Sequence, residues 1–552
     1  MTTSRNTLTK DKRERKFMMK NEKQYNLYKA VFIPSVIILA VEIIFGIFFT
    51  NQFGKILNSL IYWVGDYFGW WINVLAVLAV IFSICIIIFK YGDIRIGGED
   101  AKPDYSTWQW LSITICGGVG CGLLFWAMGE PIFHFMTPPA AARVKAGSRE
   151  AAIFAVSQAM FDWSFVQYCM YSLCGLVFAL LTYNDKKSLS FGSLIEQSSG
   201  RQIPWLTTIV QVFAVYCLAS GVSNSMGAGL LGIGAGLESV FSLEQSKIVW
   251  LFISIFVGAF FIISCVTGIS KGLTRVSTVT MFLFFFLMVY TIIFGDAIFI
   301  GKISTEAIGD IMDNFWSKIT FNNTLAPQDQ WANEWTITFW NSFIIYAPVI
   351  GMFLARLGKG RTVREFLLFN ILVPSVFCCI WIGIFAGMIM KMQTSGVTDV
   401  WAAVQNLGLQ ASIYQVLGNL PGGTIIQAVF LVTICCSFVT LADPMASVLA
   451  TLCVHNQQID DEPPKNVKIL MGVIVTTVSY LLVASGGSDS VKGLLNLGGL
   501  LMTIPMLWCF IECFRISSRL LKGTDIQLKN KCYVLHSDKV SNDVVTSGAF
   551  GR

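Results

Sequence analysis

Long apolar segments separated by short polar loops recur along the whole chain. Each segment has about 20 residues or more, the length with which an α-helix crosses roughly 30 Å of hydrocarbon. An open sheet edge is excluded because unpaired backbone groups are costly in lipid. The pattern predicts twelve helical spans, at residues 30–49, 71–89, 109–128, 153–182, 205–235, 248–268, 274–300, 336–356, 366–390, 422–451, 467–484 and 494–514.

Three polar segments lie outside these spans. Residues 1–29 are basic, and we expect a cytoplasmic tail that either contacts anionic lipid or is simply solvated. Residues 301–335 form the longest loop, in which Trp331–Trp335 is a candidate for a short interfacial helix. Residues 515–552 are polar and lack periodicity, so we expect an irregular cytoplasmic tail and a nutrient or exchange role rather than osmosensing.

The distribution of positive charge predicts the orientation. With twelve spans both termini lie on the same side. The two terminal segments and the even-numbered loops, which share that side, hold 30 of the 39 Lys and Arg residues. Cytoplasmic loops carry the excess of Lys and Arg in membrane proteins. We therefore expect a multi-pass protein of the cell membrane. Both of its termini are expected in the cytoplasm.

Composition agrees with the membrane class, and the lack of catalytic motifs disfavours an enzyme. The 552 residues are 55% hydrophobic and only 13% charged, whereas soluble domains carry about 25% charged residues. The 15 cysteines lie mostly inside apolar segments, and the three histidines form no metal-binding motif. We expect no enzyme activity, no cofactor, no metal site and no nucleic-acid partner.

The segment 338–365 looks like the wall of a transport pathway, because it is aromatic, interrupted and followed by cations. Pro348 and Gly351 interrupt it near mid-depth, and glycines interrupt the third span at Gly118, Gly120 and Gly122. Such glycines serve either tight helix packing or local unwinding that frees carbonyls. The two interrupted spans are five apart, as in transporters built from inverted repeats, which favours unwound helices at a binding site.

Aromatic residues repeat at helical spacing in two spans. They are Trp163, Tyr168 and Tyr171 in the fourth span and Trp340, Phe343 and Tyr346 in the eighth. Such stripes are more often packing than a cage. If the two faces converge, their rings would attract a cation that cannot donate hydrogen bonds, above all a quaternary ammonium.

Ionisable and hydroxyl groups add further candidates. Asp162 is either a counter-ion for a cationic substrate, a partner of a buried polar group, or a residue near the aqueous edge. Thr440 is a candidate ion or hydrogen-bond ligand, since Pro444 leaves nearby carbonyls free, and Thr280 is a second candidate. The loop after the eighth span is either a positive anchor or a gate-side salt-bridge network of Arg361, Arg364 and Glu365.

Residues 351–366, GMFLARLGKGRTVREF, closely resemble the signature of the betaine/carnitine/choline transporter family. The resemblance extends to GVGCGLLFWAMGEP, to the fourth span and to FVTLADP, and so covers about 30–515. It implies an all-α, LeuT-like fold in which two outer helices, 30–108, precede inverted five-helix repeats at 109–300 and 336–514. It also implies a homotrimer in the lipid bilayer that works by alternating access.

The resemblance further implies an aromatic box for a trimethylammonium group, drawn from Trp163, Tyr168, Tyr171, Phe343 and Tyr346. Tyr168 and Phe343 stand where the family usually has Trp, and Ser342 replaces another, so the box is expected to be wider and weaker. The unusual Asp162 would favour a cation without a carboxylate, such as choline.

Energy coupling is the second departure from the family. Sodium-coupled members have Thr-Ser where this chain has Thr440-Leu441, and leucine removes an oxygen ligand. Sodium-independent exchangers have an arginine where this chain has Thr280 and a methionine where it has Ile350. We expect a secondary transporter for carnitine, γ-butyrobetaine, glycine betaine or choline, by sodium-independent exchange or uptake. Sodium- or proton-coupled symport and a substrate-gated channel or sensor are the alternatives.

Overall fold

The computed structural model describes residues 27–267, 270–455 and 463–546, with the backbone alone at 116–121, 127–128, 265–267, 270–275, 439, 441–444 and 523–546. These residues are helical or lie in loops, and they contain no strand, only two isolated bridges. The helices are α2 Lys29–Phe48, α3 Thr50–Ile88, η1 Lys90–Asp93, α4 Thr107–Met136, η2 Ala140–Ala142, α5 Arg149–Asp162, α6 Phe165–Ala179, η3 Leu180–Asn184, α7 Phe191–Ser199, α8 Pro204–Phe241, α9 Lys247–Thr267, α10 Ser270–Phe294, α11 Ala297–Ile319, η4 Asn333–Ile337, α12 Thr338–Leu357, α13 Val363–Ser395, α14 Val400–Leu407, α15 Ala411–Gly418, α16 Gly423–Leu452, α17 Lys465–Gly486 and α18 Ser488–Thr546.

Each of the twelve predicted spans coincides with helix, and the all-α membrane fold is confirmed. Within the described residues, ten helical segments are long and apolar enough to cross a membrane. The helices α4 and α16 occupy the two remaining predicted spans. The fourth span is divided, because it consists of α5 followed by α6. The predicted seventh span, 274–300, extends past the end of α10 at Phe294 into the start of α11.

Contacts between the two predicted repeats come in pairs in which corresponding helices trade places. By their order in each repeat, α4 corresponds to α12, α6 to α13, α8 to α16, α9 to α17 and α10 to α18. The helix α12 packs on α6 while α4 packs on α13; α17 packs on α8 while α9 packs on α16; and α18 packs on α8 while α10 packs on α16. Each repeat contains five spans, an odd number, so the second repeat enters the membrane from the opposite side. The exchanged contacts are those of two inverted repeats around a shared centre.

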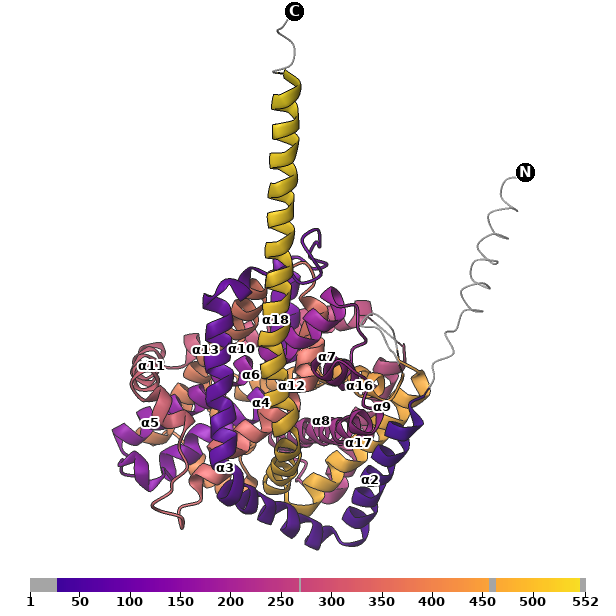
Figure 1. The fold of residues 1–552 in the computed structure, drawn as a ribbon. Helices are drawn as coiled ribbons and strands as arrows, with labels where there is room; N and C mark the ends of the chain where they lie inside the picture. Colours follow the sequence, from indigo (N-terminus) through magenta and orange to yellow (C-terminus); the bar gives the residue numbers. More distant parts are fainter. Residues whose placement is uncertain (1–26, 268–269, 456–462, 547–552) are drawn as a thin grey trace, which may run out of the picture.

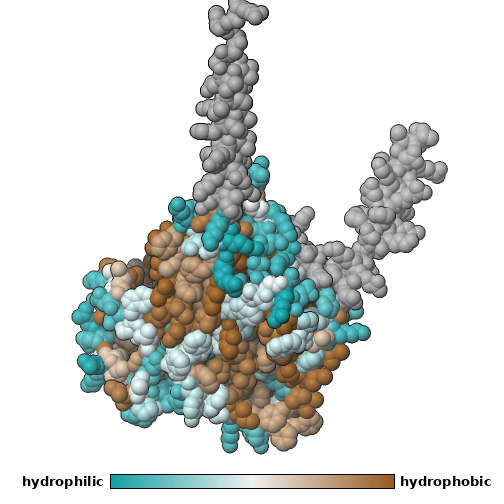
Figure 2. All heavy atoms as spheres, in the orientation of Figure 1, coloured by the Kyte–Doolittle hydropathy of each residue, from teal (hydrophilic) through white to brown (hydrophobic). Residues whose placement is uncertain are grey.

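Burial separates the central helices from the lipid-facing ones. In the most apolar stretch of α5–α6, and likewise of η4–α12, 94% of residues are buried, against 22% for α2 and for α9. Large apolar side chains on α2, α3, α9 and α10 are exposed, among them Phe48, Trp70, Phe256 and Phe282. Figure 2 shows apolar side chains spread over the flank of the helical body, as expected for a surface in contact with lipid.

The predicted helix breaks in spans three and eight are wrong for this conformation. The backbone of α4 is helical through Gly118, Gly120 and Gly122, and that of α12 is helical through Pro348 and Gly351. Gly351 serves close packing instead, since a Cβ there would lie 2.8 Å from the backbone nitrogen of Gly175 on α6. Tight packing and local unwinding both favour glycine, so the sequence does not separate them. In this structure the glycine serves packing.

The helix is instead interrupted in the fourth span, at Ser164, which follows the predicted box residue Trp163. The helix α5 ends at Asp162, Trp163 is its C-cap, and Ser164 has a non-helical backbone with φ −120° and ψ −125°. The helix α6 then starts at Phe165. Consequently the side chain of Trp163 is positioned by an interruption rather than by a continuous helical face.

Two predictions about the polar segments also need correction. Trp331–Trp335 is not a separate interfacial helix, because helical backbone runs from Trp331 through η4 into α12, whereas the loop contains the unpredicted helix α11. The C-terminal segment is not irregular, because α18 continues to Thr546 and projects from the helical body as one long helix (Figure 1). The tail therefore gives no argument against osmosensing.

Candidate functional site

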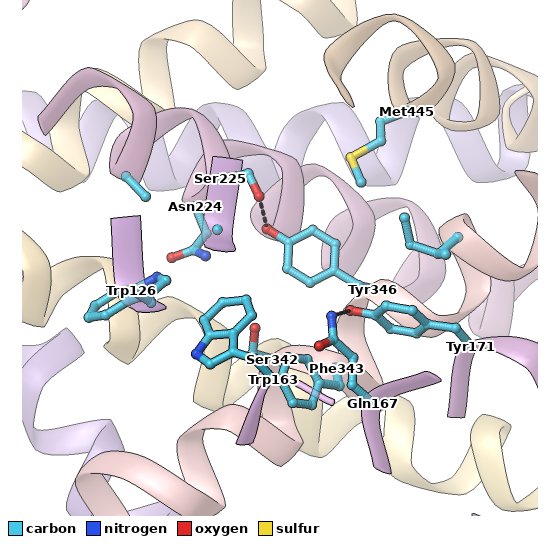
Figure 3. A pocket seen from close by; sticks show the side chains of 13 residues that line it. Trp126, Trp163, Gln167, Tyr171, Asn224, Ser225, Ser342, Phe343, Tyr346 and Met445 are labelled. Atoms are coloured by element: carbon cyan, nitrogen blue, oxygen red, sulfur yellow. Dashed lines mark hydrogen bonds between the residues drawn. The ribbon is translucent and has the colours of Figure 1, made fainter. Parts of the chain in front are cut away.

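A cavity lies at the centre of the helical body, between α4, α6, α8, α12 and α16 (Figure 3). Its free volume is about 40 Å³, room for a few water molecules only. None of the side chains around it carries a charge. They belong to Gly122, Trp126, Trp163, Gln167, Tyr171, Asn224, Ser225, Ala228, Ser342, Phe343, Tyr346, Ile350 and Met445.

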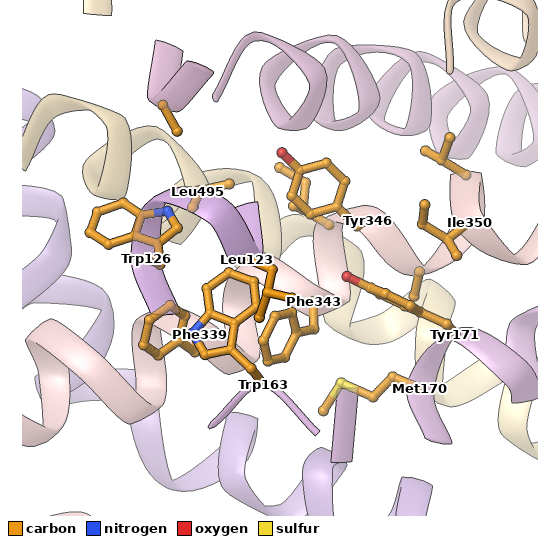
Figure 4. Close-up of a cluster of buried hydrophobic side chains, with 14 of the residues drawn as sticks. Leu123, Trp126, Trp163, Met170, Tyr171, Phe339, Phe343, Tyr346, Ile350 and Leu495 are labelled. Carbon is orange, nitrogen blue, oxygen red and sulfur yellow. The ribbon is translucent and has the colours of Figure 1, made fainter. Parts of the chain in front are cut away.

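Four of the predicted box residues line this cavity: Trp163, Tyr171, Phe343 and Tyr346. We call these four rings the inner rings; Figure 4 shows them around the same space. The ring centroid of Phe343 lies 5.9 Å from that of Trp163 and 6.2 Å from that of Tyr171, both in edge-to-face geometry. Aromatic rings that border a cavity can attract a cation that enters it.

Gly122 makes room for this arrangement. A Cβ on Gly122 would lie 3.1 Å from the edge of the Trp163 indole, closer than most real contacts. The absence of a side chain on α4 at this level lets the indole reach the cavity from the break between α5 and α6. The glycine in the third span therefore shapes the site through space rather than through an unwound backbone.

Three predicted binding residues do not line the cavity. The Tyr168 hydroxyl lies 3.3 Å from the Cys378 sulfur on α13. Trp340 is fully buried and packs against Phe161 and Phe343, so it supports the inner rings from behind. Asp162 is also fully buried, and its carboxylate accepts hydrogen bonds of 3.1 and 3.0 Å from the Gln158 amide. Of the three earlier readings of Asp162, this geometry fits a partner of a buried polar group.

Hydrogen bonds fix the inner rings in place. The Tyr346 hydroxyl lies 2.7 Å from the Ser225 hydroxyl and donates to the backbone carbonyl of Gly221, both on α8. The Gln167 amide donates to the Tyr171 hydroxyl over 3.2 Å. These bonds hold each tyrosine by its hydroxyl, and the ring itself remains available to a ligand.

Sequence reasoning missed several residues that line the cavity. They are Trp126, Gln167, Asn224, Ser225 and Met445. Trp126 had a visible signal, since it lies in the glycine-rich motif of the third span. Asn224 and Ser225 lie in the Gly- and Ser-rich part of α8, where composition obscured the polar pair. Only packing shows that α8 presents these side chains to α12.

A polar cluster adjoins the inner rings. The Trp163 indole N–H donates to a Glu130 carboxylate oxygen over 2.8 Å, and the His134 Nε2 lies 3.1 Å from the other oxygen. Beyond it the Lys318 ammonium donates to Gln158 over 3.2 Å and pairs with Asp310 over 3.0 Å. Burial lowers the pKa of Lys318 from its usual value, and the Asp310 carboxylate opposes this shift.

The expectation that the spans hold no cluster of metal-ligand type was too broad. Glu130, His134 and Asp162 place potential ligand atoms within 4.8 Å of one another. However, the indole of Trp163 and the amide of Gln158 already donate to the two carboxylates. The described geometry is that of a hydrogen-bonded cluster.

The two candidate ion ligands lie apart from the cavity wall. The Thr440 hydroxyl donates to the Ser437 carbonyl over 2.8 Å, and the Thr280 hydroxyl donates to the Val276 carbonyl over 2.9 Å. Both bonds lie within their own helices. The side chain of Leu441 lies outside the described residues.

The loop between α12 and α13 connects these helices to their neighbours. The Arg361 guanidinium lies 4.8 Å from the Trp110 ring centroid, and Arg364 pairs with Asp93 over 2.5 Å. Glu365 does not join a salt-bridge network with them, because its carboxylate caps α13 by accepting from the Thr362 N–H. The predicted three-residue network is therefore replaced by separate contacts.

Comparison with known proteins identifies the family of this chain. The family model described as betaine/carnitine/choline family transporter (BCCT) matches residues 30–520. An ectoine/hydroxyectoine transporter of Virgibacillus pantothenticus is 28% identical over 89% of this chain and 97% of its own. The glycine betaine transporter OpuD of Bacillus subtilis is 26% identical over 89% and 94%, and the osmo-dependent choline transporter BetT2 of Acinetobacter baylyi is 26% identical over 87% and 70%.

The family model covers nearly all the helices, including those that build the cavity. Both the fold and the match point to a protein that moves solutes rather than transforms them. The chain belongs to the betaine/carnitine/choline family of transporters, and it is a multi-pass membrane transporter, not an enzyme.

Proposed function

We propose that this protein moves a quaternary-ammonium solute across the cell membrane by alternating access. The observation that carries the proposal is the convergence of Trp163, Tyr171, Phe343 and Tyr346 on one uncharged cavity. Aromatic faces attract a cation that has no hydrogen to donate, and neutral polar groups nearby can bind its other end. Relatives named for glycine betaine and for choline support this substrate class.

Alternating access is favoured by the sizes of two cavities. The central cavity has about 40 Å³ of free volume, whereas pockets that hold small ligands have about 300–1,000 Å³. A second cavity of about 790 Å³, lined by residues such as Tyr62, Phe133 and Glu334, lies on the predicted extracellular side. A solute can reach the centre only if the helices between them rearrange, which disfavours the alternative of a continuously open channel.

For energy coupling we propose exchange or uptake without sodium. The support is the sequence Thr440-Leu441, which lacks a hydroxyl present in sodium-coupled members. Symport with sodium or protons is the competing hypothesis. Of the four candidate solutes, choline would need no anion partner, while carnitine, γ-butyrobetaine and glycine betaine would also place a carboxylate in the cavity.

Orientation and assembly complete the proposal. We infer from the excess of Lys and Arg that both termini lie in the cytoplasm. We also propose a homotrimer, as the family resemblance implies. Chemical labelling of cysteines introduced near Lys29 from either side of the membrane would test the first, and mass photometry of the purified protein would test the second.

The test of function is uptake into proteoliposomes of radiolabelled carnitine, γ-butyrobetaine, glycine betaine and choline. Each is measured with and without a sodium gradient, and with and without internal substrate. Saturable uptake that needs internal substrate but no sodium is the expected result. Sodium-driven uptake into empty vesicles would overturn the coupling proposal, and the absence of uptake and binding for all four solutes would overturn the substrate class.

A further inference from the structure

Lys492, near the start of α18, is a buried cation with two indole rings as its neighbours. The residue is only 6% exposed. The ammonium lies 3.6 Å from the ring centroid of Trp335 and 5.2 Å from that of Trp126. These two rings, which we call the outer rings, hold a cation as an aromatic cage does.

The outer rings are the main direct partners of this ammonium. Within the described part of the chain it makes no hydrogen bond and no ion pair; Asp489, Glu334 and Glu130 attract it from longer range. A buried ammonium without such compensation would be costly, so ring faces and nearby acids together keep it in place. Its position is set by packing of α18 rather than by a salt bridge.

Hydrogen bonds one turn further along α18 fix that packing. Asn341 donates to the Asn496 side chain over 2.8 Å, and Asn496 donates to the Thr338 hydroxyl over 2.8 Å. All three residues are buried. This network holds α18 against α12. With α18 in that position, Lys492 faces the indoles of Trp335 and Trp126.

The outer rings lie between the two cavities. The Trp335 ring contacts Phe133, which lines the wide cavity, at a centroid distance of 5.0 Å. It also contacts Trp126, which lines the central cavity, at 6.5 Å. Lys492 therefore connects three separate elements, α4, η4 and α18. They meet at the level of the outer rings, which separate the central cavity from the wide one.

From this arrangement we propose that Lys492 is a tethered cation that latches the passage between the two cavities. Its ammonium occupies the faces of Trp126 and Trp335, and an incoming quaternary ammonium displaces it by taking the same faces. Once the solute reaches the inner rings, Lys492 returns to the outer rings and closes the passage. The proposal rests on the proposed function, because it requires a substrate with an ammonium group.

A latch changes rates without changing equilibrium. Because Lys492 occupies its cage both before and after binding, its removal lowers the barrier in both directions. Association and dissociation rate constants should rise together, and the dissociation constant should remain nearly the same. A residue that binds the solute directly, or that only supports the fold, would not produce this pair of effects.

The experiment measures choline and glycine betaine binding to the full-length protein in nanodiscs by stopped-flow tryptophan fluorescence. Lys492→Met and Lys492→Gln remove the charge, and Lys492→Arg keeps it. Lys391→Met is the matched control, because that lysine also lies over a ring, Phe299 at 5.3 Å, and pairs with Asp296 over 2.8 Å. None of these three residues lines either cavity. Thermal melting checks that each variant is folded.

Both neutral variants should raise the association and dissociation rate constants by roughly 10-fold, with the dissociation constant within about threefold of the original. Lys492→Arg and Lys391→Met should stay within about threefold in both rates. Unchanged rates in whichever neutral variant folds, or a change in the dissociation constant alone, would overturn the latch. If the original protein binds neither ligand, the proposed function fails and the latch falls with it.

Discussion

The inner rings and the outer rings are two cation-accepting groups with different occupants. The inner rings, from α6, α12 and the break at Trp163, surround free space. The outer rings, Trp126 and Trp335, surround the ammonium of Lys492. Trp126 borders both groups, so they are neighbours in space while their residues come from distant parts of the chain.

The difference between the groups lies in what accompanies the aromatic residues. Neutral polar side chains such as Asn224 and Ser225 lie beside the inner rings. Carboxylates of Glu334 and Asp489 act on the ammonium at the outer rings. The Glu130 carboxylate adjoins both groups, because it accepts from the Trp163 indole and attracts Lys492 from longer range. The cavity inside the inner rings, however, is lined by uncharged groups alone, which leaves it free for a ligand that comes and goes.

The sharpest test of the inner rings is Trp163→Ala. This change removes a ring face and also the N–H that donates to Glu130. We expect the affinity for choline to fall about 30-fold, or about 2 kcal/mol, in equilibrium binding by isothermal titration calorimetry. Trp163→Phe keeps a ring and should lose less affinity; if both variants bind as the original does, Trp163 does not belong to the cage.

Tyr346→Ala comes next in size. Its ring lines the cavity, while its hydroxyl bonds to Ser225 and to the Gly221 carbonyl. The loss should be about 10-fold in choline affinity, or about 1.4 kcal/mol. Tyr346→Phe, which retains the ring, should stay within about threefold in the same titration. Equal losses in the two variants would mean that the hydroxyl, not the ring, is responsible.

Trp335→Ala should separate the outer rings from the inner ones. The variant leaves the Lys492 ammonium without its nearer ring, so the protein should be less stable by about 1–2 kcal/mol, seen as a lower melting temperature in detergent. Equilibrium choline affinity should change less than about threefold, because Trp335 does not line the central cavity. If choline affinity fell as much as in Tyr346→Ala, the inner and outer rings would have to be regarded as one binding site.

The smallest effect is expected for Tyr168→Phe. Tyr168 belongs to the box by resemblance, but its hydroxyl faces Cys378 and its ring does not line the cavity. Removing the hydroxyl should leave choline affinity within about twofold in equilibrium titration, since a buried hydroxyl near a thiol makes only a weak hydrogen bond. An effect above fivefold would place Tyr168 among the inner rings after all.

Helical spacing and the family resemblance both assign Tyr168 to the box, and the structure shows what both leave out. Counting from Trp163 at 3.6 residues per turn assumes one continuous helix. The break at Ser164 resets the phase, since α6 begins at Phe165. Within α6 itself, Tyr171 reaches the cavity, whereas Tyr168, three residues earlier, contacts Cys378 on α13, and only packing separates the two. Nothing in the local sequence marks Ser164 as the break as clearly as the glycines and Pro348 suggested breaks elsewhere.

The sequence by itself determined the class, the positions of the twelve spans and the four inner rings, because hydrocarbon selects apolar runs of a definite length and the family motifs carry the aromatic positions. Tertiary structure alone decided which helices stay continuous, because the same glycine permits close packing or unwinding. It also decided the cage of Lys492, which needs residues 126, 335 and 492 on three separate elements. Contacts of that range are set by how helices pack, and no periodicity along the chain encodes them.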